Sequence, residues 1–134
     1  MAKTFKARLL TPTGSLFEGD AAGVQVPGKN GLFEMLVNHA PIMSALEIGR
    51  VKVRKEDNSE EFYAIGGGFL ELSNNNLTVL AESAERVSEI DVERAQKARD
   101  NAIEQMKKKT ADREEAEKAL ARAENRLKLA RESQ

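Results

Sequence analysis

Short alternations of hydrophobic and polar residues run through the first two-thirds of the chain, and clusters of turn residues such as PTG, PGKNG and SNNN separate them. Alternation with a period of two is typical of a strand with one buried face. Runs this short leave no space for crossover helices, so the strands are expected to be antiparallel. The pattern predicts an antiparallel β-sandwich or flattened barrel of about eight to ten strands. The expected strands include residues 4–10, 21–27, 49–55, 60–67, 68–73 and 76–82.

The hydrophobic positions of the later strands predict the core. The expected core residues are Val51, Val53, Phe62, Ala64, Phe69, Leu72, Leu77, Val79 and Leu80. A glycine triplet, residues 66–68, separates two of these strands, and no Gly-Lys-Ser/Thr sequence of a phosphate loop follows it. A bulge or a sharp bend is therefore the better interpretation of the triplet.

After Ser88 the hydrophobic positions recur every three or four residues, which predicts amphipathic helices. The first stripe consists of Val92, Ala95, Ala98, Ala102 and Met106, and the second of Ala116, Leu120, Ala123, Leu127 and Ala130. A polar break at residues 107–112, KKKTAD, joins them. We expect an αα-hairpin that is held together weakly, because alanine buries little surface at about 0.8 kcal/mol per CH₂.

Composition changes at the same place as the period. All nine glycines, all three prolines and all the aromatic residues lie at or before Phe69, and half of the residues after Ser88 are charged. Such a shift marks a domain boundary. The predicted fold class is β + α in two domains, a sandwich over residues 1–87 and a helical hairpin over residues 88–134.

Charge and residue counts exclude several kinds of protein. The formal net charge is −1, and no basic stripe with interleaved aromatics is present, which argues against a dedicated nucleic-acid binder. The absence of cysteine and the single histidine, His39, argue against a disulfide framework and a zinc site. No apolar run is long enough to span a bilayer, and the N-terminus turns polar too soon for a signal peptide. We find no convergent acid, base or nucleophile, so catalysis is not expected.

Two interpretations fit the charges at the start of the first helix. The sequence Ser88-Glu89-Ile90-Asp91 fits a capping box, with an acid favoured by the helix dipole and Arg94 paired to Asp91 three residues later. Alternatively, Asp91 and Arg94 hold a ligand.

A column of cations on the second helix bears on this choice. Lys118, Arg122 and Arg126 are spaced by four, and neither arginine has an acid three or four positions away. Arginine suits carboxylate or phosphate because its donors form a planar fork. The arginines either meet acids of the first helix or of another subunit, or they bind phosphate. In a hairpin the start of the first helix lies beside the end of the second, which is expected to bring the two groups of charges together.

The segments PGKNGLFEMLVNHAPIMSALEIG, AIGGGFLELSNNNLTVLAESAE, IDVERA and ALARAENRLKLA occur in this order and cover most of the chain. Together they resemble the epsilon subunit of bacterial and chloroplast F-type ATP synthases. The resemblance implies a ten-stranded sandwich that packs on the gamma subunit and the c-ring, and a two-helix domain. It also implies a non-catalytic role: the folded hairpin permits turnover, and extended helices contact the alpha/beta catalytic hexamer and inhibit ATP hydrolysis.

The resemblance also implies a nucleotide site. In some members the motif that matches Ile90, Asp91, Arg94 and Ala95, with arginines matching Arg122 and Arg126, binds ATP and stabilises the folded hairpin. Asp91 is expected at the adenine or ribose and the arginines at the phosphates. Members that bind ATP weakly share much of the motif. No cofactor is required, and ATP is the expected regulatory ligand.

The expected contacts with gamma and the c-ring lie in one loop region, Leu32, Phe33, Glu34, Met35, Asn38 and His39. The family usually has Gly-acid-Leu-Gly where this chain has Gly-Leu-Phe-Glu at residues 31–34, so Phe33 and Met35 are expected to present an apolar contact surface instead. The resemblance implies a peripheral location on the cytoplasmic face of a bacterial cell membrane.

The alternative to a subunit of an ATP synthase is a free-standing ATP-sensing module with a helical clamp.

Overall fold

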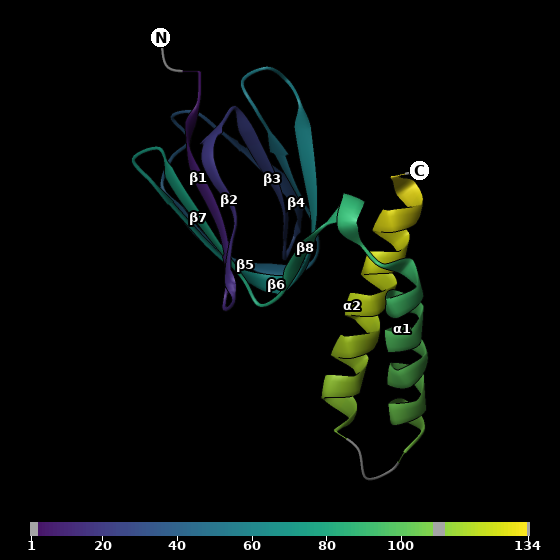
Figure 1. Cartoon of the computed structure of the whole chain (residues 1–134). Coiled ribbons are helices and arrows are strands. Elements are labelled where there is room, and N and C mark those ends of the chain that lie inside the picture. The colour runs from purple at the N-terminus through teal and green to yellow at the C-terminus, as the bar shows by residue number, and fades with distance from the viewer. Residues whose placement is uncertain (1–2, 109–111, 134) are drawn as a thin grey trace. The chain divides into compact units, whose positions relative to one another are not determined.

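The computed structural model describes residues 3–108 and 112–133. The chain divides into two compact units, one ending at Arg86 and the other beginning at Val87. The first unit contains the strands and the second contains the helices (Figure 1). The strands are β1 (Phe5–Thr11), β2 (Gly14–Ala21), β3 (Gly23–Gly28), β4 (Gly31–Leu36), β5 (Ile42–Arg54), β6 (Glu60–Ser73), β7 (Asn76–Ala81) and β8 (Ala84–Arg86). They are followed by a 3₁₀ helix, η1 (Val87–Glu89), then by α1 (Val92–Lys107) and α2 (Arg113–Glu132).

The strands form a single sheet that folds over itself into the two layers of a sandwich (Figure 1). Its order is β2-β1-β7-β6-β5-β3-β4, with β8 paired to β6, so the described part of the chain contains eight strands. The pairs β1–β2, β3–β4, β3–β5, β5–β6, β6–β7 and β6–β8 are antiparallel, as expected. Strand β1, however, pairs parallel with β7. The expectation that no strands are parallel is wrong here, because it considers only neighbours in sequence, whereas β1 and β7 are connected through the rest of the sheet.

The glycine triplet lies inside one long strand. The expected strands 60–67 and 68–73 form a single strand, β6. The strand is continuous because glycine lets the backbone bend without ending the pairing to β5. Gly67 has φ +92°, and a Cβ on Gly68 would collide with the carbonyl oxygen of Leu80. At this bend β6 changes its second partner, from β8 at Tyr63–Ile65 to β7 at Gly68–Ser73. The bend was predicted, but the continuity of the strand was not.

The core of the sandwich lies between the layers. Of the expected core residues, six are buried, namely Val51, Val53, Ala64, Leu72, Leu77 and Val79. The prediction is wrong for Phe62, which is half-buried beneath Arg50, and for Phe69 and Leu80, which are exposed. Before the triplet the inward positions include Tyr63 and Ile65, and after it they are Leu70 and Leu72. The alternation therefore shifts by one residue across the glycines, which turns Phe69 outward.

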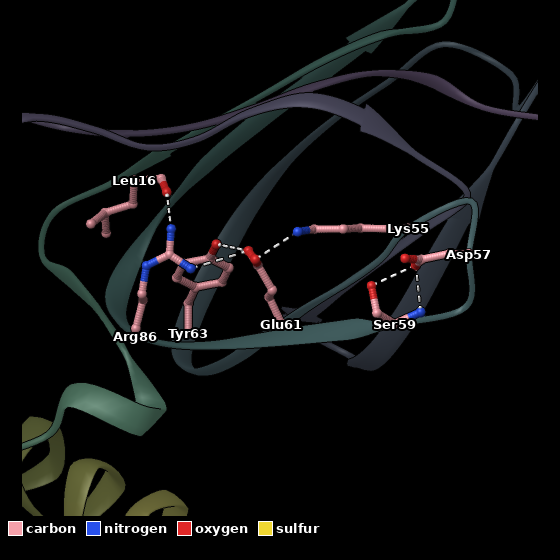
Figure 2. Close-up of polar contacts among 7 residues, drawn as sticks. All are labelled: Leu16, Lys55, Asp57, Ser59, Glu61, Tyr63 and Arg86. Carbon is pink, nitrogen blue, oxygen red and sulfur yellow. Dashed lines mark hydrogen bonds and ion pairs between the residues drawn. The ribbon is translucent and has the colours of Figure 1, made fainter.

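A polar network joins β6 to the end of the sandwich (Figure 2). The Glu61 carboxylate accepts hydrogen bonds from Lys55 Nζ at 2.8 Å and from the Tyr63 hydroxyl at 2.5 Å. Arg86 Nη1 lies 3.2 Å from the same carboxylate, and Arg86 Nη2 donates to the carbonyl oxygen of Leu16 at 3.2 Å. Since Arg86 is the last residue of β8, these contacts fix the point where the chain leaves the sandwich.

The two helices pack through small side chains. Ala95 and Ala102 of α1 are buried, and so are Ala116, Ala123 and Ala130 of α2, as the seven-residue spacing predicts. Ala98 and Val92 of the expected stripe are exposed. Leu129 is buried and was not expected, because α2 contacts η1 as well as α1 and its buried face widens there. The expected polar break at residues 107–112 lies partly outside the described residues. In the described ranges no helix is long and apolar enough to cross a membrane.

Candidate functional site

Asp91 is the N-cap of α1. Its side chain accepts a hydrogen bond from the backbone amide of Arg94 at 3.1 Å, and helix α1 begins at Val92. The predicted capping box that starts at Ser88 is wrong, because Ser88 lies inside η1, one turn too early. The local interpretation of Asp91 as a helix cap is confirmed, although its partner is the amide of Arg94 and not the guanidinium.

The other motif residues on α1 differ in exposure. Arg94 is exposed and Ile90 is half-buried, whereas Ala95 is fully buried between the helices. The Ala95 methyl group therefore has no surface for a ligand in this conformation, and its small size lets the helices approach each other.

A groove of about 400 Å³ runs between the two helices. Alanine methyl groups form its apolar lining, and amides, acids and arginines form its polar lining. The residues around it are Ala98, Asn101, Ala102, Gln105, Asp112, Glu115, Ala116, Ala119, Arg122, Ala123 and Arg126. The structure thus brings Arg122 and Arg126 to one groove, but Ile90, Asp91, Arg94 and Ala95 do not line it. The expected single cluster is divided in this conformation.

Antiparallel packing explains the division. The groove is lined by Ala98 to Gln105 on one side and by Asp112 to Arg126 on the other. Because the helices are antiparallel, Arg126 lies at the end of the groove that Ala98 lines. Arg94 lies one turn before Ala98, and Arg122 lies one turn before Arg126. Because the helices run in opposite directions, these two steps lead away from each other along the hairpin. Asp91 at the N-cap of α1 is therefore farther from Arg122 than from Arg126 along the helix axis.

Arg122 has an acidic partner on its own helix. Its Nη2 lies 3.1 Å from Glu115 Oε1, and the Arg122 side chain is 31% exposed. The interpretation of Arg122 as unpaired is wrong, because it considered acids three or four positions away, and seven residues, or two turns, also return to the same helix face. Asp112, the N-cap of α2, accepts from the Glu115 amide at 3.2 Å and so fixes the turn that carries this partner.

The groove combines apolar contact with hydrogen-bonding and cationic groups. Its alanine floor offers apolar contact, Asn101 and Gln105 offer amide donors and acceptors, and Arg122 and Arg126 offer guanidinium donors. Its volume falls in the range of about 300–1,000 Å³ that small-molecule sites occupy. The two amides were not identified from the sequence, since nothing in their spacing distinguishes them from ordinary surface residues.

Four of the six predicted contact residues lie on β4, where inward and outward side chains alternate. Met35 is fully buried, so the prediction that it presents an apolar surface is wrong, and Phe33 is half-buried against the core. Leu32 is 60% exposed and Leu36 is 47% exposed, and Glu34 also faces outward. The outward apolar side chains are thus the leucines, one residue out of phase with the expectation.

Asn38 and His39 have local partners. Asn38 has φ +65°, its amide donates to Asn75 Oδ1 at 2.7 Å, and Asn75 Nδ2 donates back to Asn38 Oδ1 at 3.0 Å. This reciprocal pair fastens the segment after β4 to the turn between β6 and β7. His39 Nδ1 lies 2.7 Å from the carbonyl oxygen of Ala40, which orients the ring.

Two groups of large hydrophobic side chains face outward on the sandwich. Leu32 and Leu36 belong to β4, and Met43 at the start of β5 is 66% exposed. Phe69 and Leu80 are opposite each other on β6 and β7, and are 39% and 52% exposed. Exposed side chains of this size and apolarity are typical of contact surfaces.

Two family models together match nearly the whole chain. The model described as ATP synthase, Delta/Epsilon chain, beta-sandwich domain matches residues 4–87, and the model described as ATP synthase, Delta/Epsilon chain, long alpha-helix domain matches residues 88–131. The chain belongs to the ATP synthase delta/epsilon family. This family membership confirms the resemblance on which the sequence motifs were interpreted.

Members of the family from several bacteria align over nearly the full chain. The ATP synthase epsilon chain of Shouchella clausii is 38% identical over 128 residues, which are 96% of this chain and 96% of the relative. That of Moorella thermoacetica is 40% identical over 124 residues, 91% of this chain and 92% of the relative.

Solved structures share the fold. A chain in the Euglena gracilis mitochondrial ATP synthase (OSCP/F1/c-ring in rotational state 1) has a TM-score of 0.79 and 21% identity, covering 93% of this chain and 80% of that chain. A chain in the Tetrahymena thermophila mitochondrial ATP synthase (central stalk/c-ring) has a TM-score of 0.59 and 12% identity, covering 96% of this chain and 94% of that chain. The predicted sandwich followed by a two-helix hairpin is therefore confirmed.

Proposed function

We propose that the chain is a non-catalytic subunit in the central stalk of a rotary ATP synthase, where it helps to couple ion-driven rotation of the c-ring to ATP synthesis. The observation that carries this proposal is the alignment with epsilon chains over 96% of both lengths. The solved structures with the same fold come from an F1/c-ring assembly and from a central stalk with its c-ring. In this role the chain is peripheral to the membrane, on the cytoplasmic face of a bacterial cell, and its partners hold it there.

The sandwich is the docking unit in this proposal. Its outward hydrophobic residues, Leu32, Leu36, Met43, Phe69 and Leu80, supply apolar contact for the gamma subunit and the c-ring. Asn38 then acts by fixing the segment next to these residues through its pair with Asn75, and His39 acts through a ring held against the carbonyl oxygen of Ala40.

The hairpin is the regulatory unit. An interface made mainly of alanine buries little area, so the helices separate at low cost, and the extended helices inhibit ATP hydrolysis at the alpha/beta hexamer. ATP bound in the interhelical groove favours the folded hairpin, because a ligand stabilises the state that binds it. The proposal that ATP is the ligand is supported by the groove lining, which consists of alanines, amides, acids and two arginines.

Association with gamma tests the proposed function. The tagged full-length chain is mixed with the gamma subunit of a bacterial ATP synthase and passed over a sizing column. A stable one-to-one complex is expected, and adding the chain to a complex of alpha, beta and gamma is expected to lower ATP hydrolysis. No association with gamma, together with saturable ATP binding by the chain alone, would instead support a free-standing ATP-sensing module.

A further inference from the structure

The polar lining of the groove is electrically balanced. Asp112 and Glu115 contribute two negative charges, and Arg122 and Arg126 contribute two positive charges. A polyanion that enters this groove therefore meets acids as well as arginines.

The Glu115 carboxylate contacts the guanidinium of Arg122, a group that would bind such an anion. The 3.1 Å contact between Glu115 Oε1 and Arg122 Nη2 spans seven residues, a rise of about 10.5 Å along the helix. Both side chains must therefore extend toward each other along the wall of the groove. Carboxylate and phosphate oxygens use the same donors of a guanidinium. A phosphate that uses the N–H directed at Glu115 must displace the carboxylate.

The N-terminal capping of α2 fixes the position of Glu115. Asp112 caps the helix by accepting from the Glu115 amide, and the first turn of a helix favours an acid because the helix dipole is positive there. The same turn also holds Glu114, whose side chain is 81% exposed, pairs with Lys118 at 3.8 Å and does not line the groove. Of these two neighbouring acids, only Glu115 faces Arg122.

We propose that Glu115 is an internal competitor for the phosphates of a nucleoside triphosphate in the interhelical groove, and that it lowers the affinity of the groove for this ligand. The inference rests on the proposed regulatory role of ATP. An exposed ion pair is weak and easily exchanged, so Glu115 tunes the affinity and does not block the site. Removing its charge is expected to raise the affinity about three- to tenfold.

The test compares Glu115→Gln with Glu114→Gln in the full-length chain. Both variants remove one negative charge from the same turn and keep the size of the side chain, so a general effect of net charge is the same in both. Binding of ATP, and of inorganic triphosphate as a probe without a base, is measured by calorimetry at low salt. Circular dichroism confirms that the helix content of each variant is unchanged.

The expected result is tighter binding of both probes by Glu115→Gln, with less than a twofold change in Glu114→Gln. Equal affinities in the wild type and Glu115→Gln, or equal gains in both variants, would overturn the role of Glu115 and leave ATP sensing intact. Binding by Glu115→Gln alone would support the inference and place the wild-type affinity below the measured range. No binding by any variant at millimolar concentrations would overturn both the ATP site and the competition.

Discussion

At the scale of single residues, the Glu61 carboxylate of the sandwich links stability to pH. Partial burial raises its pKa, but hydrogen bonds from Lys55 and Tyr63 and the charges of Lys55 and Arg86 together lower it, so that the pKa of Glu61 lies below the ordinary value of 4.5. A carboxyl group whose pKa is depressed by folding stabilises the native state above the pKa of the unfolded chain. That stabilisation is lost as the pH falls from about 4.5 through the lower native pKa.

The change Glu61→Gln is expected to lower the free energy of unfolding of the sandwich at pH 7 by about 1–2 kcal/mol, because two charged hydrogen bonds and one ion pair are lost. The variant is also expected to lose less stability than the wild type between pH 5 and pH 3. Urea titrations followed by the fluorescence of Tyr63, the single tyrosine of the chain, measure both effects. Glu60→Gln is the matched control, since Glu60 pairs with Lys52 at the longer distance of 3.6 Å. Identical pH profiles for Glu61→Gln and the wild type would contradict this role of Glu61.

The same scale shows where sequence reasoning failed. The search for partners of Arg122 considered one helical turn, and the acid lies two turns away. Met35 was expected at the surface because the family motif differs there, whereas the alternation in β4 turns it inward. Both outcomes depend on side-chain direction, which the secondary-structure pattern supplies only when its phase is known.

At the scale of the elements, the glycine bend in β6 decides how the sheet is built. The period-two pattern identified the strands on both sides of the bend, and the change of period after Ser88 identified both helices. The phase of the alternation could not be followed across residues 66–68, because glycines carry no side chain to report it. Phe69 was consequently assigned to the wrong face.

The substitution Gly68→Ala is expected to destabilise the sandwich by at least about 3 kcal/mol, because its Cβ would collide with the backbone oxygen of Leu80, which cannot move aside as a side chain could. Gly14→Ala is the comparison: Gly14 has φ +142°, and a Cβ added there would meet open space, so only backbone strain is introduced. Thermal unfolding followed by near-ultraviolet circular dichroism measures the difference. Similar losses in the two variants would show that the close approach to β7 is relaxed in solution.

The alanine contact of the hairpin leads to a second prediction for the elements. Ala95→Leu is expected to separate the helices, at a cost of about 1–3 kcal/mol, because Ala95 is fully buried between them. Ala121→Leu adds the same side chain at an exposed position of α2 and is expected to be neutral. Nuclear Overhauser contacts between α1 and α2 report the hairpin directly. Retention of these contacts in Ala95→Leu would mean that the interface adapts to a larger side chain.

At the scale of the whole molecule, the two units differ in how they are stabilised, which suits the two roles proposed for them. The sandwich has a continuous hydrophobic core, whereas the described helices bury mainly alanine methyl groups. The division was visible in the composition, but the outward apolar residues of the proposed docking surface were not, because exposure depends on which strands lie at each face.

Exchanging both exposed residues of the β6–β7 pair, Phe69→Ser with Leu80→Ser, is expected to weaken association with the ATP synthase complex by at least about tenfold, since apolar contact area is lost from the docking unit. Stability of the isolated chain is expected to change little, because both side chains face outward. Pull-down with gamma and the c-ring measures the association, and Glu18→Ser on β2 is an exposed control. Undiminished association would move the docking surface to Leu32, Leu36 and Met43.

The parallel pairing of β1 with β7 has a consequence for folding during synthesis of the chain. Lys6 pairs with Asn76, and Arg8 reaches Thr78 seventy residues later in the chain. On the ribosome, the edge of β1 that pairs with β7 therefore has no partner until almost the entire sandwich has been synthesised. Contacts of such long sequence separation slow folding to the range of milliseconds to seconds, whereas a helical hairpin of local contacts forms far faster. The helical hairpin follows the sandwich in the chain but is thus expected to reach its structure sooner after its own synthesis.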